Sequence, residues 1–249
     1  MSGFLGSGDL YYNRVVSGVS QGWLRFGNAT KFEIKENATI KERKSRGKSD
    51  YGQIKDSVGL KDAAEIAISL DDLDKDNLAL AFLGDVSTIA VTGASATAEP
   101  QTAQEGKSLR LVYGKVSAVV VKDVTDTTTY VLGTDYNILS ATLGLIEIIA
   151  GAAISSGDVL HINYTHATVA GDRVKGGTSP SVKVALLLDG ENFADQSESQ
   201  VNVWEAVLTP QTGVDFLAED YAVLELNGTL NTPTGKTSAY EVDTSIVYT

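Results

Sequence analysis

The sequence has no cysteine and only two histidines among its 249 residues. Without cysteine the chain forms no disulfide bonds and offers no thiolate ligands to a metal. His161 and His166 are five residues apart on a predicted strand, so their side chains should point to opposite faces. We therefore expect neither a shared metal site nor a cofactor.

Long hydrophobic runs are also lacking. The apolar stretch from Leu143 to Ile154 is too short, and too interrupted by glycine, to span a membrane. The first residues, "MSGFLGSGDLYY", lack the basic and apolar segments of a secretion leader. We expect a protein that has no membrane partner.

Positive charge is scarce and unevenly placed. The chain carries 20 Lys and Arg against 32 Asp and Glu, a net charge of −12. Residues 175–249 hold 3 bases and 11 acids, whereas "KERKSRGK" at 41–48 holds five bases and one acid. The acidic excess argues against nucleic acid as the main partner. It allows the basic segment of one copy to meet an acidic surface of another.

Alternation of apolar and polar residues predicts a mainly β protein. In "KFEIKENATI" (31–40) Phe32 and Ile34 share one side of a half-buried strand, and "DAAEIAISL" (62–70) repeats the pattern. The polar segment 41–60 lies between them, and a loop this long in a compact domain is functional or disordered. As a hairpin with arms of ~10 residues, it would reach roughly 30 Å.

One helix is predicted within "SLDDLDKDNLALAFLGD" (69–85). Ser69 or Asp71 is expected to cap its start, and Gly84 to end it in the left-handed conformation. Four carboxylates crowd the positive end of the helix dipole, namely Asp71, Asp72, Asp74 and Asp76.

Two short motifs resemble chemical sites. Gly18–Gly22 matches the G-x-S-x-G nucleophile pattern around Ser20, but that pattern requires a following helix and "GWLRFGN" reads as strand and turn. Asp72-x-Asp74-x-Asp76 matches the start of a calcium loop whose later glycine and glutamate are missing. We predict that the protein is not an enzyme, with a hydrolase using Ser20 as an alternative.

The middle of the chain differs from the rest in composition and in the length of its apolar runs. Residues 86–106 are small and polar and read as a linker, short β-type runs follow to about residue 167, and 169–181 read as a return linker. The pattern predicts one discontinuous β-domain, 1–95 with 172–249, and an inserted small β-sandwich at 96–171.

Whole segments in order carry a family resemblance. "SGFLGSGDLYYNRV", "GNATKFEIKENATIKERKSRGKSDYGQ" and "ISLDDLDKDNLALAFLGD", with "LLLDGENFADQ" and "VNVWEAVLTPQTGVDFLAEDYAVLELNGTL" in the last third, together resemble the major tail tube proteins of long-tailed bacteriophages. The likeness covers roughly residues 1–90 and 175–249. The middle resembles a β-module appended to various phage structural proteins.

The resemblance implies a β-sandwich or barrel with one flanking helix. Six copies would join their sheets into a ring, and the rings would stack into a tube that conducts DNA into the host. Expected partners are other copies and the tape measure, terminator and distal tail proteins. The protein would be assembled in the host cytoplasm and belong to the virion. Tubes of contractile injection systems and of type VI secretion are related alternatives.

A lumen that bound phosphates would stall the DNA, so we expect a net acidic lumen that DNA passes without specific binding. The resemblance also implies that the loop Lys41–Asp56 reaches the neighbouring ring. Its contact residues would be Lys41, Glu42, Arg43, Lys44, Arg46, Lys48 and Tyr51. Their acidic docking partners would be Asp71, Asp72, Asp74 and Asp76, or the acidic last third of the chain. The inserted domain would project outward. An alternative function is a surface adhesin that binds a host through this domain.

Overall fold

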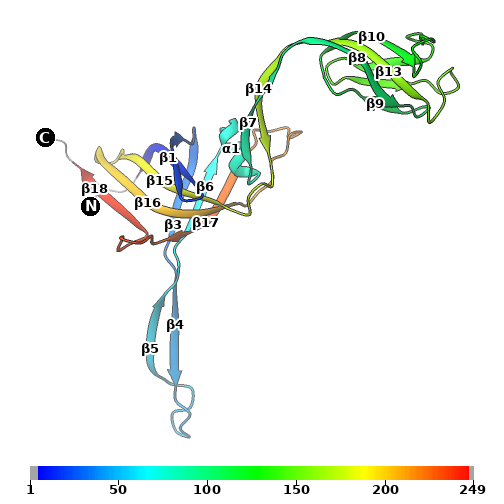
Figure 1. Ribbon diagram of the computed structural model, residues 1–249. Coiled ribbons are helices and arrows are strands. Elements are labelled where there is room, and N and C mark those ends of the chain that lie inside the picture. Colours follow the sequence, from blue (N-terminus) through cyan, green and yellow to red (C-terminus); the bar gives the residue numbers. More distant parts are fainter. Residues whose placement is uncertain (1–4, 247–249) are drawn as a thin grey trace. The chain divides into compact units, whose positions relative to one another are not determined.

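The computed structural model describes residues 5–246 and confirms a mainly β fold with one helix. The chain divides into two compact units (Figure 1). We call residues up to Ser87 together with those from Arg173 onward the sheet unit, and Thr88–Asp172 the inserted unit. The inserted unit thus begins eight residues before the predicted boundary at 96 and ends one residue after the predicted 171.

The sheet unit is built on one antiparallel eight-stranded sheet. Its strands are β1 (Gly6–Val16), β2 (Val19–Arg25), β3 (Ala29–Lys35), β6 (Glu65–Leu70), β15 (Val182–Asn192), β16 (Ser197–Pro210), β17 (Leu224–Asn231) and β18 (Tyr240–Ile246). The order is β2-β1-β15-β16-β17-β6-β3. The long strand β16 also pairs with β18 through its first half, and with β17 through its second half.

The sheet must curve strongly, because its two edges are joined by a very short link. Only residues 26–28 separate the end of β2 from the start of β3, a span of about 14 Å at most. In a flat sheet, six strand spacings of ~4.8 Å would separate those edges by about 29 Å. The backbone N–H of Phe26 donates to the carbonyl of Leu10 at 2.9 Å, which anchors the link beside β1.

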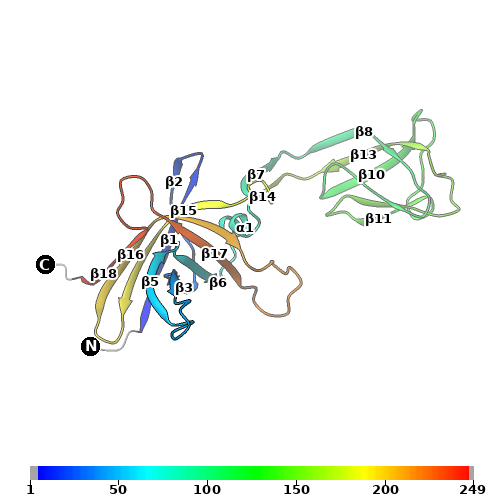
Figure 2. The same ribbon diagram turned by 90° about the horizontal axis from the view of Figure 1, so that it is seen from below.

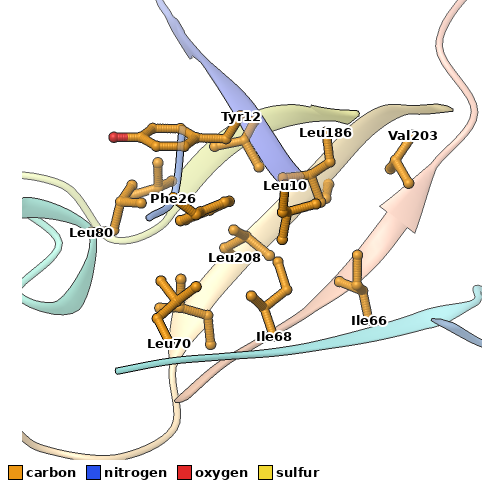
Figure 3. Close-up of a cluster of buried hydrophobic side chains, with 14 of the residues drawn as sticks. Leu10, Tyr12, Phe26, Ile66, Ile68, Leu70, Leu80, Leu186, Val203 and Leu208 are labelled. Atoms are coloured by element: carbon orange, nitrogen blue, oxygen red, sulfur yellow. The ribbon is translucent and has the colours of Figure 1, made fainter. Parts of the chain in front are cut away.

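The hydrophobic core fills the inside of this curve. Alternate residues of β1, β6, β15, β16 and β17 supply its buried side chains, whereas β2 is exposed throughout. Leu10 of β1 and Ile68 of β6 belong to one buried cluster although three strands lie between theirs in the sheet (Figure 3). Leu80 of the helix α1 (Lys75–Ala81) belongs to the same cluster. Each fully buried Leu or Ile contributes roughly 1.5–3 kcal/mol, so this cluster is the main source of the unit's stability.

The helix is shorter than predicted and begins at a different cap. Asp74, and not Ser69 or Asp71, is the N-cap, and its side chain accepts a hydrogen bond from the backbone N–H of Asn77 at 2.7 Å. Ser69 cannot cap the helix because it belongs to β6, where it pairs with Glu225 of β17. The sheet pairing therefore overrides the local helix signal until residue 74.

The helix end also differs from the prediction. Leu83, and not Gly84, adopts the left-handed conformation, with φ of 49°. The N–H groups of Leu83 and Gly84 donate to the carbonyls of Leu80 and Ala79, at 3.2 and 2.7 Å, which is a Schellman motif. Gly84 is needed for another reason, since a Cβ there would lie 2.2 Å from the carbonyl oxygen of Lys175.

The inserted unit contains two three-stranded sheets, β10-β13-β8 and β11-β12-β9. The strands are β8 (Ala94–Thr102), β9 (Ser108–Arg110), β10 (Val116–Asp123), β11 (Tyr136–Ser140), β12 (Leu145–Ile148) and β13 (Val159–His166). Both sheets contribute to a second core of twelve buried residues, among them Ile146 and Ile162. The predicted strand "TTTYVLG" (127–133) forms only two isolated bridges, Thr129 with Lys122 and Leu132 with Tyr136.

Both predicted linkers contain a boundary between the two units, but neither is irregular. Residues 86–106 contain β7 (Asp85–Val91) and β8, and residues 169–181 contain β14 (Val169–Lys175), which pairs with β7. Small polar residues give no periodic signal, and these strands are held by main-chain hydrogen bonds to partners about 60 to 80 residues away. Within residues 5–246, no helix is long and apolar enough to cross a membrane.

Candidate functional site

The predicted basic loop is a two-stranded antiparallel hairpin. β4 (Ala38–Lys44) and β5 (Ile54–Lys61) pair from Ala38 opposite Lys61 to Lys44 opposite Ile54 (Figure 1). We call residues 38–61 the basic hairpin. Its arms are shorter than the predicted ~10 residues and reach about 23 Å at ~3.3 Å per residue. Every residue of both strands is exposed, so neither face packs on the protein.

The charge of the basic hairpin is available to a partner. It holds seven bases and three acids. Its ion pairs are internal and exposed: Lys44 with Glu42 at 3.6 Å, and Lys55 with Asp50 at 3.3 Å. Such pairs contribute ~0–1 kcal/mol. Five further bases have no ion-pair partner in the part of the chain that the structure describes, namely Lys41, Arg43, Arg46, Lys48 and Lys61.

The basic hairpin also exposes large apolar side chains, namely Ile40, Tyr51, Ile54, Val58 and Leu60. Val58 lies opposite Lys41 and so shares its face, while Ile40 lies on the other face. Isolated two-stranded hairpins are marginally stable in water, because they bury too little apolar surface. The ordered form of this hairpin therefore gains from any surface that covers it.

The tip of the basic hairpin is shaped by local hydrogen bonds. The N–H of Ser45 donates to Gln53 at 2.7 Å, and the N–H of Gly52 donates to Ser45 at 2.9 Å. Gly52 has φ of 86°, which favours glycine. This turn leaves Arg46, Lys48 and Tyr51 exposed at the end of the hairpin.

The four predicted acidic partners have local roles near α1. Both carboxylate oxygens of Asp71 accept from the Asn28 amide, at 2.8 and 2.9 Å, and Asp74 is the N-cap. Asp72 lies against Gly27, and Asp76 is half-buried in the first helical turn. Burial, together with the nearby carboxylates of Asp76 and Asp74, raises the pKa of Tyr12. Within one copy, in residues 5–246, neither Asp71 nor Asp74 forms an ion pair with the basic hairpin.

The face of the sheet opposite the core is polar and strongly acidic. Strand alternation and register place ten acids and four bases on it, and we call it the acidic face. The acids are Asp9, Glu33, Glu65, Asp189, Glu191, Glu198, Glu205, Glu225, Glu241 and Asp243, and the bases are Arg25, Lys31, Lys35 and Lys183.

Two carboxylates on the acidic face, those of Glu33 and Glu205, have lowered pKa values, which favours the charged form. The side-chain amide of Asn231 donates to Glu205 at 2.9 Å and, with Lys183, lowers the pKa of that carboxyl. Lys31 lowers the pKa of Glu33 in the same way. A depression of about 560 Å³ between β1, β15 and β16 is lined by Asp9 and by three more acids, namely Asp189, Glu191 and Glu198.

The curved sheet is not closed. β2 and β3 end the strand order, and no other strand of the described chain pairs with their outer edges. β2 reaches β1 only from Tyr11 onward. A depression of about 190 Å³ is lined by residues 6–8 of β1 and 29–32 of β3. Unpaired strand edges are templates for pairing with another chain.

The nucleophile pattern at Ser20 does not form an elbow. Ser20 lies inside β2, and its hydroxyl is hydrogen-bonded to the Asn13 side chain at 2.7 and 3.0 Å. The two histidines belong to the inserted unit. His161 faces Asp126 at 3.3 Å, whereas His166 is buried and stacks on Tyr113 at 3.9 Å, so the two point to opposite faces as predicted. No cluster of metal-ligating side chains is found within residues 5–246.

One surface within the acidic last third of the chain was not singled out from the sequence. The loop between β16 and β17, residues 211–223, makes a wide excursion (Figure 2), and we call it the acidic loop. Leu217 and Tyr221 are 92% and 94% exposed, and Phe216 is 73% exposed. The loop carries Asp215, Glu219 and Asp220, and no base. Bulky apolar residues interspersed with acids between two strands were the available signal.

Comparison with known proteins places the chain in one family. A family model described as "Protein of unknown function UCP028589" matches residues 3–241. The chain belongs to this family. No curated protein matches it.

Proposed function

We propose that the chain is a structural subunit of a phage-type tail tube, in which six copies form a ring and rings stack into a conduit for DNA. The observation that carries this proposal is the acidic face of the curved, open sheet. In a ring whose lumen is lined by these faces, carboxylates repeated in every copy repel the DNA phosphates. Bases on such a surface would instead bind phosphates by releasing counterions.

The open sheet edges support lateral joining. The outer edges of β2 and β3 and the first residues of β1 have unmade main-chain hydrogen bonds. A closed ring of identical copies satisfies such edges without leaving an aggregation-prone end.

The basic hairpin supports axial stacking. It exposes both faces and carries a net positive charge on an acidic protein. Each exposed contact to the next ring would be weak, ~0–1 kcal/mol. Six-fold repetition adds these contacts, and charge complementarity fixes the polarity of stacking.

A second candidate function, a binding module on a virion or cell surface, is favoured by the separate core of the inserted unit. Deleting Thr88–Asp172 and joining the ends with a short linker distinguishes the two. A tube subunit should still form rings, whereas an adhesin should keep its oligomeric state and lose its binding to host cells.

Negative-stain electron microscopy of the purified chain tests the proposal. We expect six-fold rings or tubes. Changing Lys41, Arg43, Lys44, Arg46 and Lys48 to glutamate should leave single rings or smaller species. A different closed oligomer, or a monomer at high concentration, would contradict the tube assignment.

A further inference from the structure

We propose that the acidic loop (residues 211–223) of one copy is the surface on which the basic hairpin (residues 38–61) of a second copy docks. This inference rests on the proposed self-assembly and names the surface that receives the hairpin. The two segments have complementary charge. The acidic loop holds three acids and no base, while the basic hairpin has four more bases than acids. Opposed patches of this kind steer association and fix register.

In both segments, exposed apolar side chains lie next to the charged ones. In the acidic loop, Phe216 lies beside Asp215, and Tyr221 beside Asp220. In the basic hairpin, Val58 shares a face with Lys41, and Tyr51 lies at the tip with Lys48. Exposed apolar side chains clustered among charges mark interaction sites. A contact between these segments would bury hydrophobic surface and pair charges together.

The acidic loop is held in a defined position, which a docking surface requires. At its base the N–H of Gln211 donates to Glu225 at 2.8 Å, and the Asn227 amide donates to the Gln211 side chain at 3.0 Å. At its apex Asp215 accepts from the N–H of Leu217 at 2.8 Å. The Phe216 ring lies 6.0 Å from that of Phe82. These contacts fix the main chain, while Leu217 and Tyr221 stay exposed.

Other acidic surfaces of the chain fit less well. Asp71 and Asp74 are occupied by Asn28 and by the start of α1. The acidic face is more acidic overall, but its four bases are interspersed among the acids and interrupt the attraction for the hairpin. The acidic loop alone combines unopposed acids with nearly fully exposed apolar side chains among the described residues. Both segments are exposed within one copy, so both are accessible to a second copy.

Disulfide trapping tests the contact directly, because the chain has no cysteine of its own. Full-length Tyr51→Cys and full-length Leu217→Cys, one of them carrying a size tag, are mixed under mild oxidation. Both positions are exposed, so neither substitution disturbs a core. We expect a tagged–untagged heterodimer as the main product on a non-reducing gel. The control pairs Tyr51→Cys with Val131→Cys, whose side chain is 58% exposed in the inserted unit, and should give little product.

Charge exchange supplies an independent measurement. Changing Asp215, Glu219 and Asp220 to lysine should weaken association at least tenfold in sedimentation velocity. A matched control changes three acids of the acidic face, Asp189, Glu241 and Asp243, to lysine. This control should weaken association less. The variant with three lysines in the acidic loop, called the lysine loop, is then combined with the change of Lys41, Arg43, Lys44, Arg46 and Lys48 to glutamate. This combination should restore association.

The outcomes separate this inference from the proposed function. Rings or tubes without the heterodimer, or without an effect of the lysine loop, overturn the docking surface and leave the tube assignment standing. The heterodimer and the charge rescue, without rings or tubes, support the docking surface and overturn the tube. A chain that does not associate at any accessible concentration overturns both.

Discussion

The basic hairpin and the inserted unit are both additions to the sheet unit, but they are stabilised in opposite ways. The inserted unit has its own buried cluster, with Ile146, Ile148 and Ile162 inaccessible to solvent. The basic hairpin buries none of its strand residues. An element with a core can be ordered alone, whereas an exposed ribbon depends on what covers it. The contrast indicates that the inserted unit is a separable module, whereas the hairpin has no core of its own.

The largest expected effect is the loss of stability when one core side chain of the inserted unit is truncated. Ile162→Ala should lower its free energy of unfolding by ~2–5 kcal/mol, because a cavity replaces the lost contacts. The matched change Val58→Ala in the basic hairpin should alter stability by less than ~0.5 kcal/mol. Circular dichroism during urea unfolding measures both. Trp23 and Trp204 lie in the sheet unit, so their fluorescence should report a transition that Ile162→Ala does not move. Equal losses from the two changes would contradict the comparison.

Reversing the charge of the basic hairpin should affect association and leave the stability of the monomer unchanged. With Lys41, Arg43, Lys44, Arg46 and Lys48 changed to glutamate, association should weaken at least tenfold, which is about 1.4 kcal/mol. The urea midpoint of the monomer should stay within error, because these side chains make no contact with the core. If the charge-reversed variant associates normally, the hairpin is not part of the interface.

Salt should act on the hairpin contact and not on the inserted unit. Raising the salt from 0.05 to 0.5 M shortens the Debye length to below about 5 Å and screens exposed charges. Association should weaken severalfold, while the unfolding of the inserted unit should change little. Sedimentation at the two salt concentrations measures the first, and calorimetry the second. Association that strengthens with salt would mean that the contact is mainly apolar.

The smallest expected effect is a pH response inside the inserted unit. Hydrogen bonds from the Thr125 hydroxyl at 2.5 Å and the Thr128 N–H at 2.9 Å lower the pKa of Asp123 from 3.8 to about 2. The pKa is lower in the folded state, so the stabilisation is present above pH 3.8 and is lost as the pH falls through about 2. Carboxyl chemical shifts of Asp123 measure this, with Asp123→Asn as the control. Titration near 3.8 would show that the turn is not formed.

The sequence predicts the elements whose signals are local. Alternation in "EIAISL" identifies β6, and the run "KERKSRGK" identifies the hairpin because its charge contrasts with the rest of the chain. The strand β8, "ASATAEPQT", has no such pattern, since its residues are small and its partner β13 is some 60 residues away. It reads as a linker for that reason.

Features that depend on tertiary placement could not be predicted. The N-cap is Asp74 because Ser69 is taken by the pairing of β6 with β17, which the local sequence does not encode. The acidic loop looks like an ordinary connection until its exposure is known. Leu217 and Tyr221 would be read as core residues from their chemistry alone, yet they are 92% and 94% exposed.

Amide hydrogen exchange of the full chain, dilute and assembled, tests the central claim most directly. In the monomer, the amides of β4 and β5 should exchange rapidly while those of β13 stay protected by their core. On assembly, the hairpin amides and those of residues 211–223 should become protected together. Hairpin amides that are already protected in the monomer, or that still exchange freely in the assembled state, would contradict the account.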